Sequence, residues 1–199
     1  MEIGVRNPED NFNKIKCKSK FSVDPGIEFK ENPVDYKMTS DAFFKRIEDQ
    51  TLFIPGGLNF DVIFIDGLHL ANQVELDINN SLRIISDKGF IVVHDCNPPT
   101  EFHARESFGF KNSPARGFWN GTTWKAFYKF RHIEGLYSIC FDSDWGVGII
   151  SKTKYPSFNN LGLPLENPYF EFNSHQVNKG FYMNFQNFTK WKETNKLNS

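Results

Sequence analysis

The sequence predicts an α/β fold with an open, twisted and mostly parallel β-sheet, helices on both faces and an antiparallel hairpin near the C-terminus. Apolar runs typical of strands alternate along the chain with segments of helical periodicity. The runs at 60–66 and 90–94 are almost continuously apolar, as expected for strands covered on both faces. A strand, a helix and a strand in this order favour a right-handed crossover and parallel pairing.

The first part of the chain supplies short elements. In chain order we expect a strand at 2–5, a helix at 8–15, strands at 20–24 and 34–38, and a helix at 39–48. Pro8 suits the first turn of a helix, and Thr39 suits a helix cap. Phe43, Phe44 and Ile47 then form one apolar face of the helix at 39–48.

The central unit has the clearest pattern. A helical spacing of three to four residues joins Leu70, Val74, Ile78, Leu82 and Ile85. After a turn at 87–89 and the second strand, we expect a helix at 122–132, a hairpin formed by 136–141 and 145–150, and a short helix near 187–196. The sequence thus predicts a Rossmann-like domain over 1–151. Residues 152–199 form an extension that packs on this domain or is partly flexible.

Composition limits the classes of function. The 199 residues have a formal net charge of −1, which gives no general attraction to nucleic acid or to an anionic membrane. There is no signal-peptide pattern and no apolar stretch of about 20 residues that would span a bilayer. The 3 cysteines are far apart, which argues against a disulfide framework. We expect a cytoplasmic protein without nucleic-acid or membrane partners. Whether the protein forms a homo-oligomer stays open.

Four strand ends carry residues suited to binding. Ligands of open α/β sheets bind at the carboxyl ends of the strands, where Gly4, Asp24, Asp66 and Asp95 lie. Gly4 allows a ligand to approach the backbone, and Asp24 can accept hydrogen bonds from both hydroxyls of a ribose. A turn glycine and solvated acids would give the same pattern without a ligand. The sequence lacks both G-x-G-x-x-G and a P-loop, which disfavours dinucleotides and triphosphates.

Two histidines accompany the acids. His69 follows Asp66 by three residues and can act as a general base; alternatively it caps or packs the start of the next helix. Asp66 and Asp95 end neighbouring strands about 4.8 Å apart, so they share either a proton or a cation. His94 precedes Asp95 in the strand, and alternation directs it to the opposite face. We therefore expect His94 to pack at the strand end.

The irregular stretch at 97–120 projects from the same edge of the sheet. It carries His103, Arg105, Arg116 and Trp119, and we expect it to form a lid over the acceptor. The two arginines suit an anionic or sugar acceptor. The alternative is a partner-binding segment without a catalytic role.

These residues resemble the class I S-adenosylmethionine-dependent methyltransferases, in particular the small-molecule branch called methyltransferase family 24. The resemblance covers roughly residues 2–151. It rests most on "DVIFIDGLH" and "IVVHDCNPP", with support from "EIGV", "FSVDP" and "MTSDAFF". Two departures are clear: the glycine-rich turn keeps only its first glycine, and we expect the sequence to lack the helices that usually precede the first strand.

The resemblance implies roles for individual residues. The cofactor-binding residues it implies are Glu2, Gly4, Asp24, Ser40, Asp41, Asp66 and Gly67. Glu2 and Gly4 would hold the methionine part of S-adenosyl-L-methionine. Asp24 would bind its ribose, while Ser40 and Asp41 would frame the adenine. Catalysis would fall to Asp66 and His69. In relatives that use a divalent metal, the ligands map to Asp66 and Asp95, and Mg²⁺ is the ion expected there.

The sequence therefore predicts methyl transfer from S-adenosyl-L-methionine to a small-molecule acceptor, at an oxygen of a sugar or polysaccharide precursor. Such a transfer is an in-line displacement that depends on holding acceptor and methyl group in reactive geometry. The alternative is a non-catalytic, Rossmann-like nucleoside-binding or scaffold protein. An NAD-dependent oxidoreductase is disfavoured because its glycine signature is absent.

Overall fold

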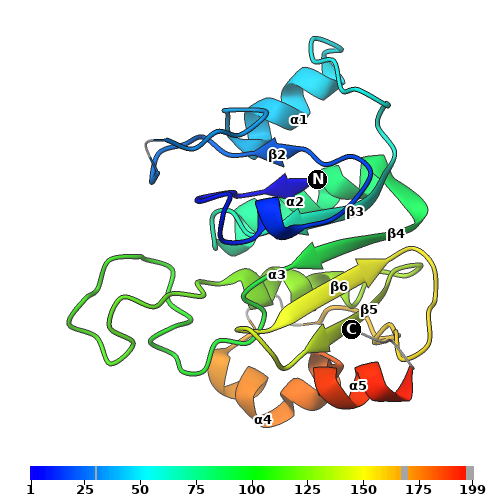
Figure 1. Ribbon diagram of the computed structural model, residues 1–199. Helices are drawn as coiled ribbons and strands as arrows, with labels where there is room; N and C mark the ends of the chain where they lie inside the picture. Colours follow the sequence, from blue (N-terminus) through cyan, green and yellow to red (C-terminus); the bar gives the residue numbers. More distant parts are fainter. Residues whose placement is uncertain (30, 167–169, 196–199) are drawn as a thin grey trace.

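The computed structural model of the protein describes residues 1–29, 31–166 and 170–195. Within them one open sheet contains β1 Glu2–Ile3, β2 Ser22–Val23, β3 Phe60–Ile65, β4 Ile85–Val93, β5 Tyr137–Phe141, β6 Val147–Ser151 and β7 Phe185–Gln186 (Figure 1). Their order across the sheet is β2-β1-β3-β4-β6-β5-β7. Strands β1 to β4 pair in parallel, and β6 runs antiparallel to β4 and β5. The predicted α/β class with its antiparallel hairpin is confirmed.

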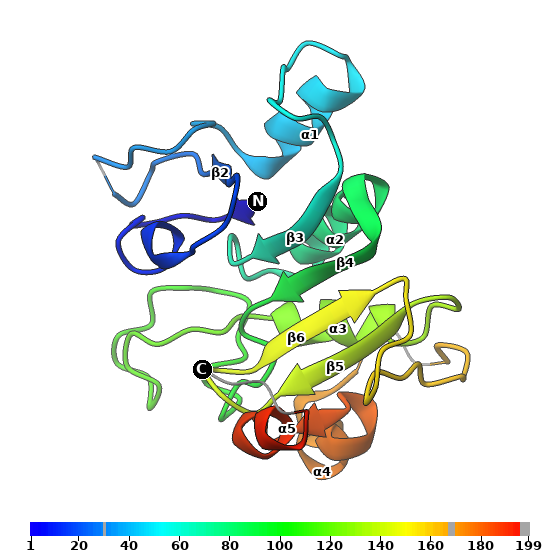
Figure 2. The ribbon, with the colours of Figure 1, turned by 45° about the vertical axis from the view of Figure 1, so that its right-hand side comes forward.

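The helices of the described residues are α1 Ser40–Glu48, α2 Ala71–Ile84, α3 Thr123–Phe130, α4 Phe172–Tyr182 and α5 Phe188–Thr194. Figures 1 and 2 show α2 and α3 behind the sheet, with α4 and α5 near β5. Trp191 of α5 packs on Phe141, in a cluster on the face opposite α2 and α3. Helices therefore lie on both faces, as predicted. None of the described helices combines the length and apolar composition that crossing a bilayer requires.

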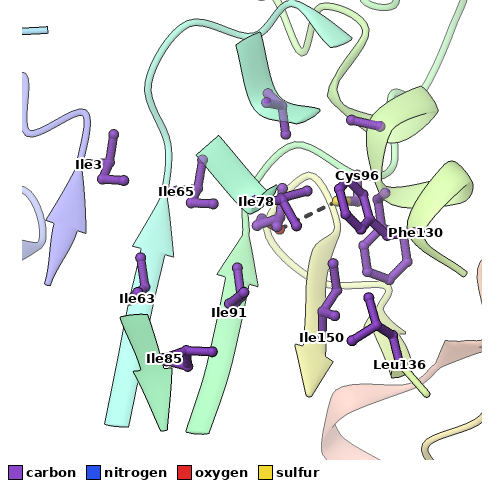
Figure 3. Close-up of a cluster of buried hydrophobic side chains, with 14 of the residues drawn as sticks. Ile3, Ile63, Ile65, Ile78, Ile85, Ile91, Cys96, Phe130, Leu136 and Ile150 are labelled. Atoms are coloured by element: carbon purple, nitrogen blue, oxygen red, sulfur yellow. Dashed lines mark hydrogen bonds between the residues drawn. The ribbon is translucent and has the colours of Figure 1, made fainter. Parts of the chain in front are cut away.

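The core between the sheet and α2 fixes the site-bearing strands. Ile63 and Ile65 of β3 and Ile91 and Val93 of β4 are buried on one face, as strand alternation requires. Figure 3 shows the three isoleucines beside Ile78 of α2. Burying each aliphatic side chain contributes about 1.5–3 kcal/mol. This packing holds the carboxyl ends of β3 and β4 in fixed register.

The predicted helix at 8–15 is wrong. The segment forms turns and one short 3-10 helix, η1 Phe12–Lys14, which buries none of its residues. The Oδ1 atom of Asn7 accepts a hydrogen bond from the backbone N–H of Glu9 at 3.2 Å. Local side-chain bonds of this kind compete with the helix, and no apolar stripe compensates for them.

Two other elements differ in extent. The predicted strand at 34–38 is reduced to an isolated bridge between Tyr36 and Val23. The predicted turn at 87–89 lies inside β4, which already begins at Ile85 and is irregularly paired with β3 there.

The segment after residue 151 contributes to the core. Phe170 is buried in the main cluster, and His175 of α4 packs on Trp124 with ring centroids 4.5 Å apart. The short helix near 187–196 is confirmed as α5. Within the predicted extension, 167–169 and 196–199 lie outside the described residues. The domain boundary at residue 151 stays a prediction.

Candidate active site

Gly4, Asp66 and His94 lie side by side at the carboxyl edge of the sheet. Each directly follows the last residue of its strand, and those last residues are register partners across β1, β3 and β4. From β1 the chain moves outward to β2 and then returns to β3 on the other side. Open α/β sheets bind their ligands where the strand order reverses in this way. The structure thus places the predicted strand-end residues where this rule puts a ligand.

Gly4 brings the first turn directly against the end of β3. Its φ is +86°, and a Cβ built on it would lie 2.2 Å from the carbonyl oxygen of Asp66 and 2.4 Å from the Cα of Gly67. No side chain fits that space, and the backbone conformation also favours glycine. Gly4, Asp66 and Gly67 are therefore brought together as predicted.

Two aspartates and two histidines form the centre of the site. His69 places Nε2 3.3 Å from Oδ1 of Asp66 and Nδ1 3.0 Å from Oδ2 of Asp95. His94 places Nδ1 3.3 Å from the same Asp66 oxygen and 3.5 Å from the same Asp95 oxygen. On its other side, Nε2 of His94 lies 3.4 Å from Oδ2 of Asp144. Each histidine thus bridges both acids.

The prediction that His94 points to the face opposite the acids is wrong, although it does pack at the strand end, against the ring of Phe64. Strand alternation stops at Asp95, whose φ of +62° turns the chain into the left-handed region. The carboxylate of Asp95 consequently swings back beside the ring of His94. It is only 4% exposed and also accepts a hydrogen bond from the Nδ2 atom of Asn120.

The contacts between these histidines and aspartates shift their pKa values. Burial opposes the charged form of His94, but the contacts with Asp66 and Asp95 outweigh burial and raise its pKa to about 11. Burial also opposes ionisation of Asp66, yet the contacts with His69 and His94 lower its pKa. The pKa of His69 is raised by Asp66 and Asp95 against the effect of burial. At neutral pH His94 is therefore cationic and compensates part of the negative charge at the carboxyl edge.

His69 is held by the end of the 97–120 loop. Its ring stacks on Trp119 with centroids 5.1 Å apart, and Nδ1 lies 3.1 Å from the carbonyl oxygen of Trp119. Its own carbonyl oxygen accepts a 2.8 Å hydrogen bond from the backbone N–H of Thr122. The first turn of α2 is bound by Thr122, whose Oγ1 accepts from the N–H of Ala71 at 2.8 Å. His69 is thus packed and oriented by the loop and does not cap α2 with its side chain.

The other predicted contacts with the methionine and ribose parts of the cofactor lie on β1 and β2. Asp24 follows β2, next in the sheet to β1, and its Oδ1 accepts a 2.6 Å hydrogen bond from the N–H of Gly26. Its Oδ2 atom makes no hydrogen bond with any residue that the structure describes, and it could accept one from a ligand. Glu2 lies within β1, is 4% exposed and accepts a hydrogen bond from Asn11 at 3.1 Å. Burial raises the pKa of Glu2.

Ser40 and Asp41 are held against α2. The Nε2 atom of Gln73 donates to Oδ1 of Asp41 at 2.9 Å and to Oγ of Ser40 at 3.3 Å. It also reaches Asp77, a buried carboxyl, at 3.3 Å. Burial raises the pKa of Asp77 to about 6. This network fixes the first turn of α1, and it does not join the cluster of Asp66 and Asp95 directly.

Sequence reasoning missed two residues that shape the site. Asn120 is 1% exposed and contacts Asp95, and Thr122 is 3% exposed and binds the start of α2. The dipeptide Asn120–Gly121 signals a turn, but it contains no information on which distant groups the turn contacts.

The donor atoms suit a cation. Asp66, His69 and Asp95 each offer one ligand atom, and these atoms lie within 4.8 Å of one another. Two carboxylates and an imidazole match the ligand types of divalent metals. Asp66 and Asp95 were predicted as ligands; the imidazole of His69 is an addition from the structure.

Residues 21–96 match the family model of a methyltransferase domain, methyltransferase family 24. No curated protein matches the chain. The matched segment runs from β2 to the residue after Asp95, so it includes Asp24 and Asp66 but leaves Gly4 outside. The match supports assignment of this chain to a class I S-adenosylmethionine-dependent methyltransferase family.

Proposed function

We propose that the protein transfers the methyl group of S-adenosyl-L-methionine to a hydroxyl oxygen of a small molecule, such as a sugar or polysaccharide precursor. One observation carries the proposal: Asp66, His69 and Asp95 converge at the carboxyl edge, directly beside the turn at Gly4. The matched methyltransferase domain supports methyl transfer in general. The acid and base groups beside the turn favour an acceptor that must lose a proton.

The cofactor would lie over the ends of β1, β2 and β3. The peptide groups around Gly4 would contact its methionine part, since no side chain intervenes there. The free oxygen of Asp24 would accept hydrogen bonds from the ribose hydroxyls. Glu2 would bind through the backbone or through Asn11, because its carboxylate is buried. Ser40 and Asp41 would frame the adenine from the start of α1.

His69 would take the proton of the acceptor hydroxyl. Both of its ring nitrogens face acceptor atoms, which orients the ring and favours the imidazolium form. It can serve as a base only after losing its own proton, so the raised pKa of His69 shifts activity toward alkaline pH. Asp66 would orient the ring and stabilise the imidazolium formed in the reaction.

In an alternative version of the mechanism, a divalent metal would be held by Asp66, His69 and Asp95, and His69 would then be a ligand instead of the base. When bound, such an ion lowers the pKa of an acceptor hydroxyl. Mg²⁺ prefers oxygen ligands alone, whereas imidazole is a ligand of Zn²⁺ and Fe²⁺. The mixed set therefore favours a transition metal over the Mg²⁺ expected from the sequence. The cationic His94, 3.3 Å from Asp66, would compete with the ion for the same oxygens.

A transfer assay tests the proposal. The full chain is incubated with methyl-labelled S-adenosyl-L-methionine and a panel of hydroxylated sugars, with and without Mn²⁺ or Mg²⁺. We expect label in an acceptor, and a loss of about a hundredfold or more in Asp66→Asn and His69→Gln. Asp87→Asn is the matched control because its side chain is 96% exposed on the amino half of β4. Equal turnover in all three variants would contradict the proposal.

One observation favours a non-catalytic nucleoside-binding protein as the second candidate. The turn after Gly4 leads only into the three-residue η1, so no α-helix N-terminus faces a ligand there. That function predicts binding of adenosyl ligands without turnover. A preserved binding affinity together with no labelled product from any acceptor would favour it.

A further inference from the structure

The last residues of the 97–120 loop form a closed neck beside the candidate active site. The backbone N–H groups of Asn120 and Gly121 both donate to the carbonyl oxygen of His103, each at 3.0 Å. The loop therefore closes on itself at this point, and the residues between His103 and Asn120 project beyond the sheet (Figure 1). We call residues 119–122 the loop neck.

Asn120 of the loop neck determines how the carboxylate of Asp95 is turned. Its Nδ2 atom donates to Oδ1 of Asp95 at 2.5 Å, and the two residues are only 1% and 4% exposed. Because the amide engages Oδ1, Oδ2 is the oxygen that lies 3.0 Å from Nδ1 of His69 and 3.5 Å from Nδ1 of His94. Asp95 also has a φ of +62°, a backbone conformation that the surrounding contacts have to hold. The bond from Asn120 is one of these contacts.

The other end of the Asn120 amide is left unsatisfied. Its Oδ1 atom is shielded from solvent and has no partner among the residues that the structure describes. Asn184, which is 8% exposed, is different. Its Nδ2 atom donates to the backbone carbonyls of Ser138 and Ser157 at 2.9 and 2.8 Å, and its Oδ1 atom accepts from Gln186 at 3.2 Å. A buried acceptor without a partner lowers stability, and such violations are expected at functional sites.

The next two residues of the loop neck fix the backbone of His69. A Cβ built on Gly121 would lie 1.9 Å from the carbonyl oxygen of His69, and the φ of Gly121 is +62°. Glycine alone suits this position. The backbone N–H of Thr122 donates to the same oxygen at 2.8 Å. Consecutive residues of the neck thus hold Asp95 through its side chain and His69 through its main chain.

We propose that Asn120 is a positioning residue that acts through Asp95. It holds Oδ2 of Asp95 toward the ring of His69, so that the acid and the imidazole reach their common geometry with the loop neck in place. The contribution of Asn120 to methyl transfer rests on the proposed function, whereas the energetic coupling between Asn120 and Asp95 does not.

Methyl-transfer kinetics of the full chain test the positioning role. Asn120→Leu keeps a similar volume and removes the donor, whereas Asn120→Ala removes both. We expect each variant to lower kcat by about ten- to hundredfold, because a small misplacement of reacting groups costs rate of this order. KM for S-adenosyl-L-methionine should change by less than about twofold, because the proposed cofactor contacts lie elsewhere along the edge. A role in filling space predicts instead that Asn120→Leu retains the wild-type kcat.

Asn184→Ala is the matched control, because it removes a buried asparagine amide just before β7. It should lower the midpoint of urea unfolding without changing kcat. The positioning role is overturned if Asn120→Leu retains the wild-type kcat, or if Asn184→Ala lowers kcat as much as Asn120→Ala does.

A double-mutant cycle in urea unfolding measures the coupling without any activity. Asn120→Leu is made in the wild type and in Asp95→Ala; Asp95→Ser replaces Asp95→Ala if the latter does not fold. The midpoint shift caused by Asn120→Leu should be at most about half as large once the carboxylate of Asp95 is gone, whereas Asn184→Ala should give the same shift in both backgrounds. An additive cycle for Asn120 and Asp95 overturns the coupling.

The two measurements separate this proposal from the proposed function. Methyl transfer by the wild type together with an additive cycle removes the role of Asn120 and leaves the proposed function in place. A coupled cycle together with no transfer by the wild type removes the proposed function and the catalytic part of the role, and it leaves the coupling between Asn120 and Asp95.

Discussion

His94 and Asp66 end neighbouring strands and meet across the edge of the sheet, with Nδ1 3.3 Å from Oδ1. The same imidazole also reaches Asp95, so one cation stands between two carboxylates. This contact makes the paired acids tolerable in a partly buried setting, and it links the stability of the edge to pH.

We predict that His94→Gln removes a pH-dependent part of the stability. The folded pKa of about 11 lies above the ordinary value of 6.5, so the stabilisation is complete below about pH 6.5 and is lost as the pH rises through about 11. We expect the wild type to exceed the variant by about 1–3 kcal/mol at neutral pH, after allowing for the partial exposure of Asp66. Urea unfolding from neutral to alkaline pH measures the difference, and a constant difference across that range would contradict the prediction.

Asp77→Asn should stabilise the protein at neutral pH. Burial raises the folded pKa of Asp77 from 3.8 to about 6, so its contribution is complete below pH 3.8 and is lost as the pH rises through about 6. The amide is neutral throughout and avoids that loss, which amounts to about 1–3 kcal/mol. Unfolding free energies measured below and above this window should show a gain only above it. A variant less stable than the wild type at neutral pH would contradict this account.

Gly4→Ala should destabilise the protein and disturb the site. A methyl group there would lie 2.2 Å from the carbonyl oxygen of Asp66, besides requiring a φ of +86°. Gly56→Ala is the matched control, because Gly56 has a φ of +84° and a methyl group added to it would meet no atom within 4 Å. We expect Gly4→Ala to cost about 1–3 kcal/mol more than Gly56→Ala in thermal or urea unfolding. Equal costs would show that the contact with Asp66 is loose.

The pH profile of methyl transfer should report His69. Activity should rise with pH along a limb set by its raised pKa, because only the neutral ring accepts a proton. Asp66→Asn removes one of the contacts that raise this pKa, so the limb should move toward lower pH. A purely structural role for His69 predicts a profile that Asp66→Asn does not move, with only the amplitude reduced.

The sequence predicted correctly those segments whose apolar side chains bury one regular face. Strand β3, the second half of β4 and helix α2 follow directly from the apolar pattern of residues such as Ile65, Ile91 and Ile78, because each buries one regular face. The common edge of Gly4, Asp66 and Asp95 then follows from parallel pairing. Elements that depend on distant contacts were missed. Helix α4 carries a non-helical residue, Asn178, that interrupts its periodicity, and β7 consists of two residues.

The sequence predicted which residues form the site better than it predicted how they are arranged. Alternation along the strand placed His94 away from the acids, and the left-handed conformation of Asp95 reversed that arrangement. Such a conformation is uncommon outside glycine and leaves no periodic signal. The contact of Asn120 with Asp95 spans 25 residues of an irregular loop, and no local pattern encodes it.

Calorimetric titration of the full chain with S-adenosyl-L-homocysteine tests the central claim most directly. We predict saturable binding that Asp24→Ala weakens by about tenfold or more, since the ribose loses its acceptor, while Asp87→Ala leaves it unchanged. No binding to the wild type, or equal binding to all three proteins, would contradict the assignment of this edge as a cofactor site.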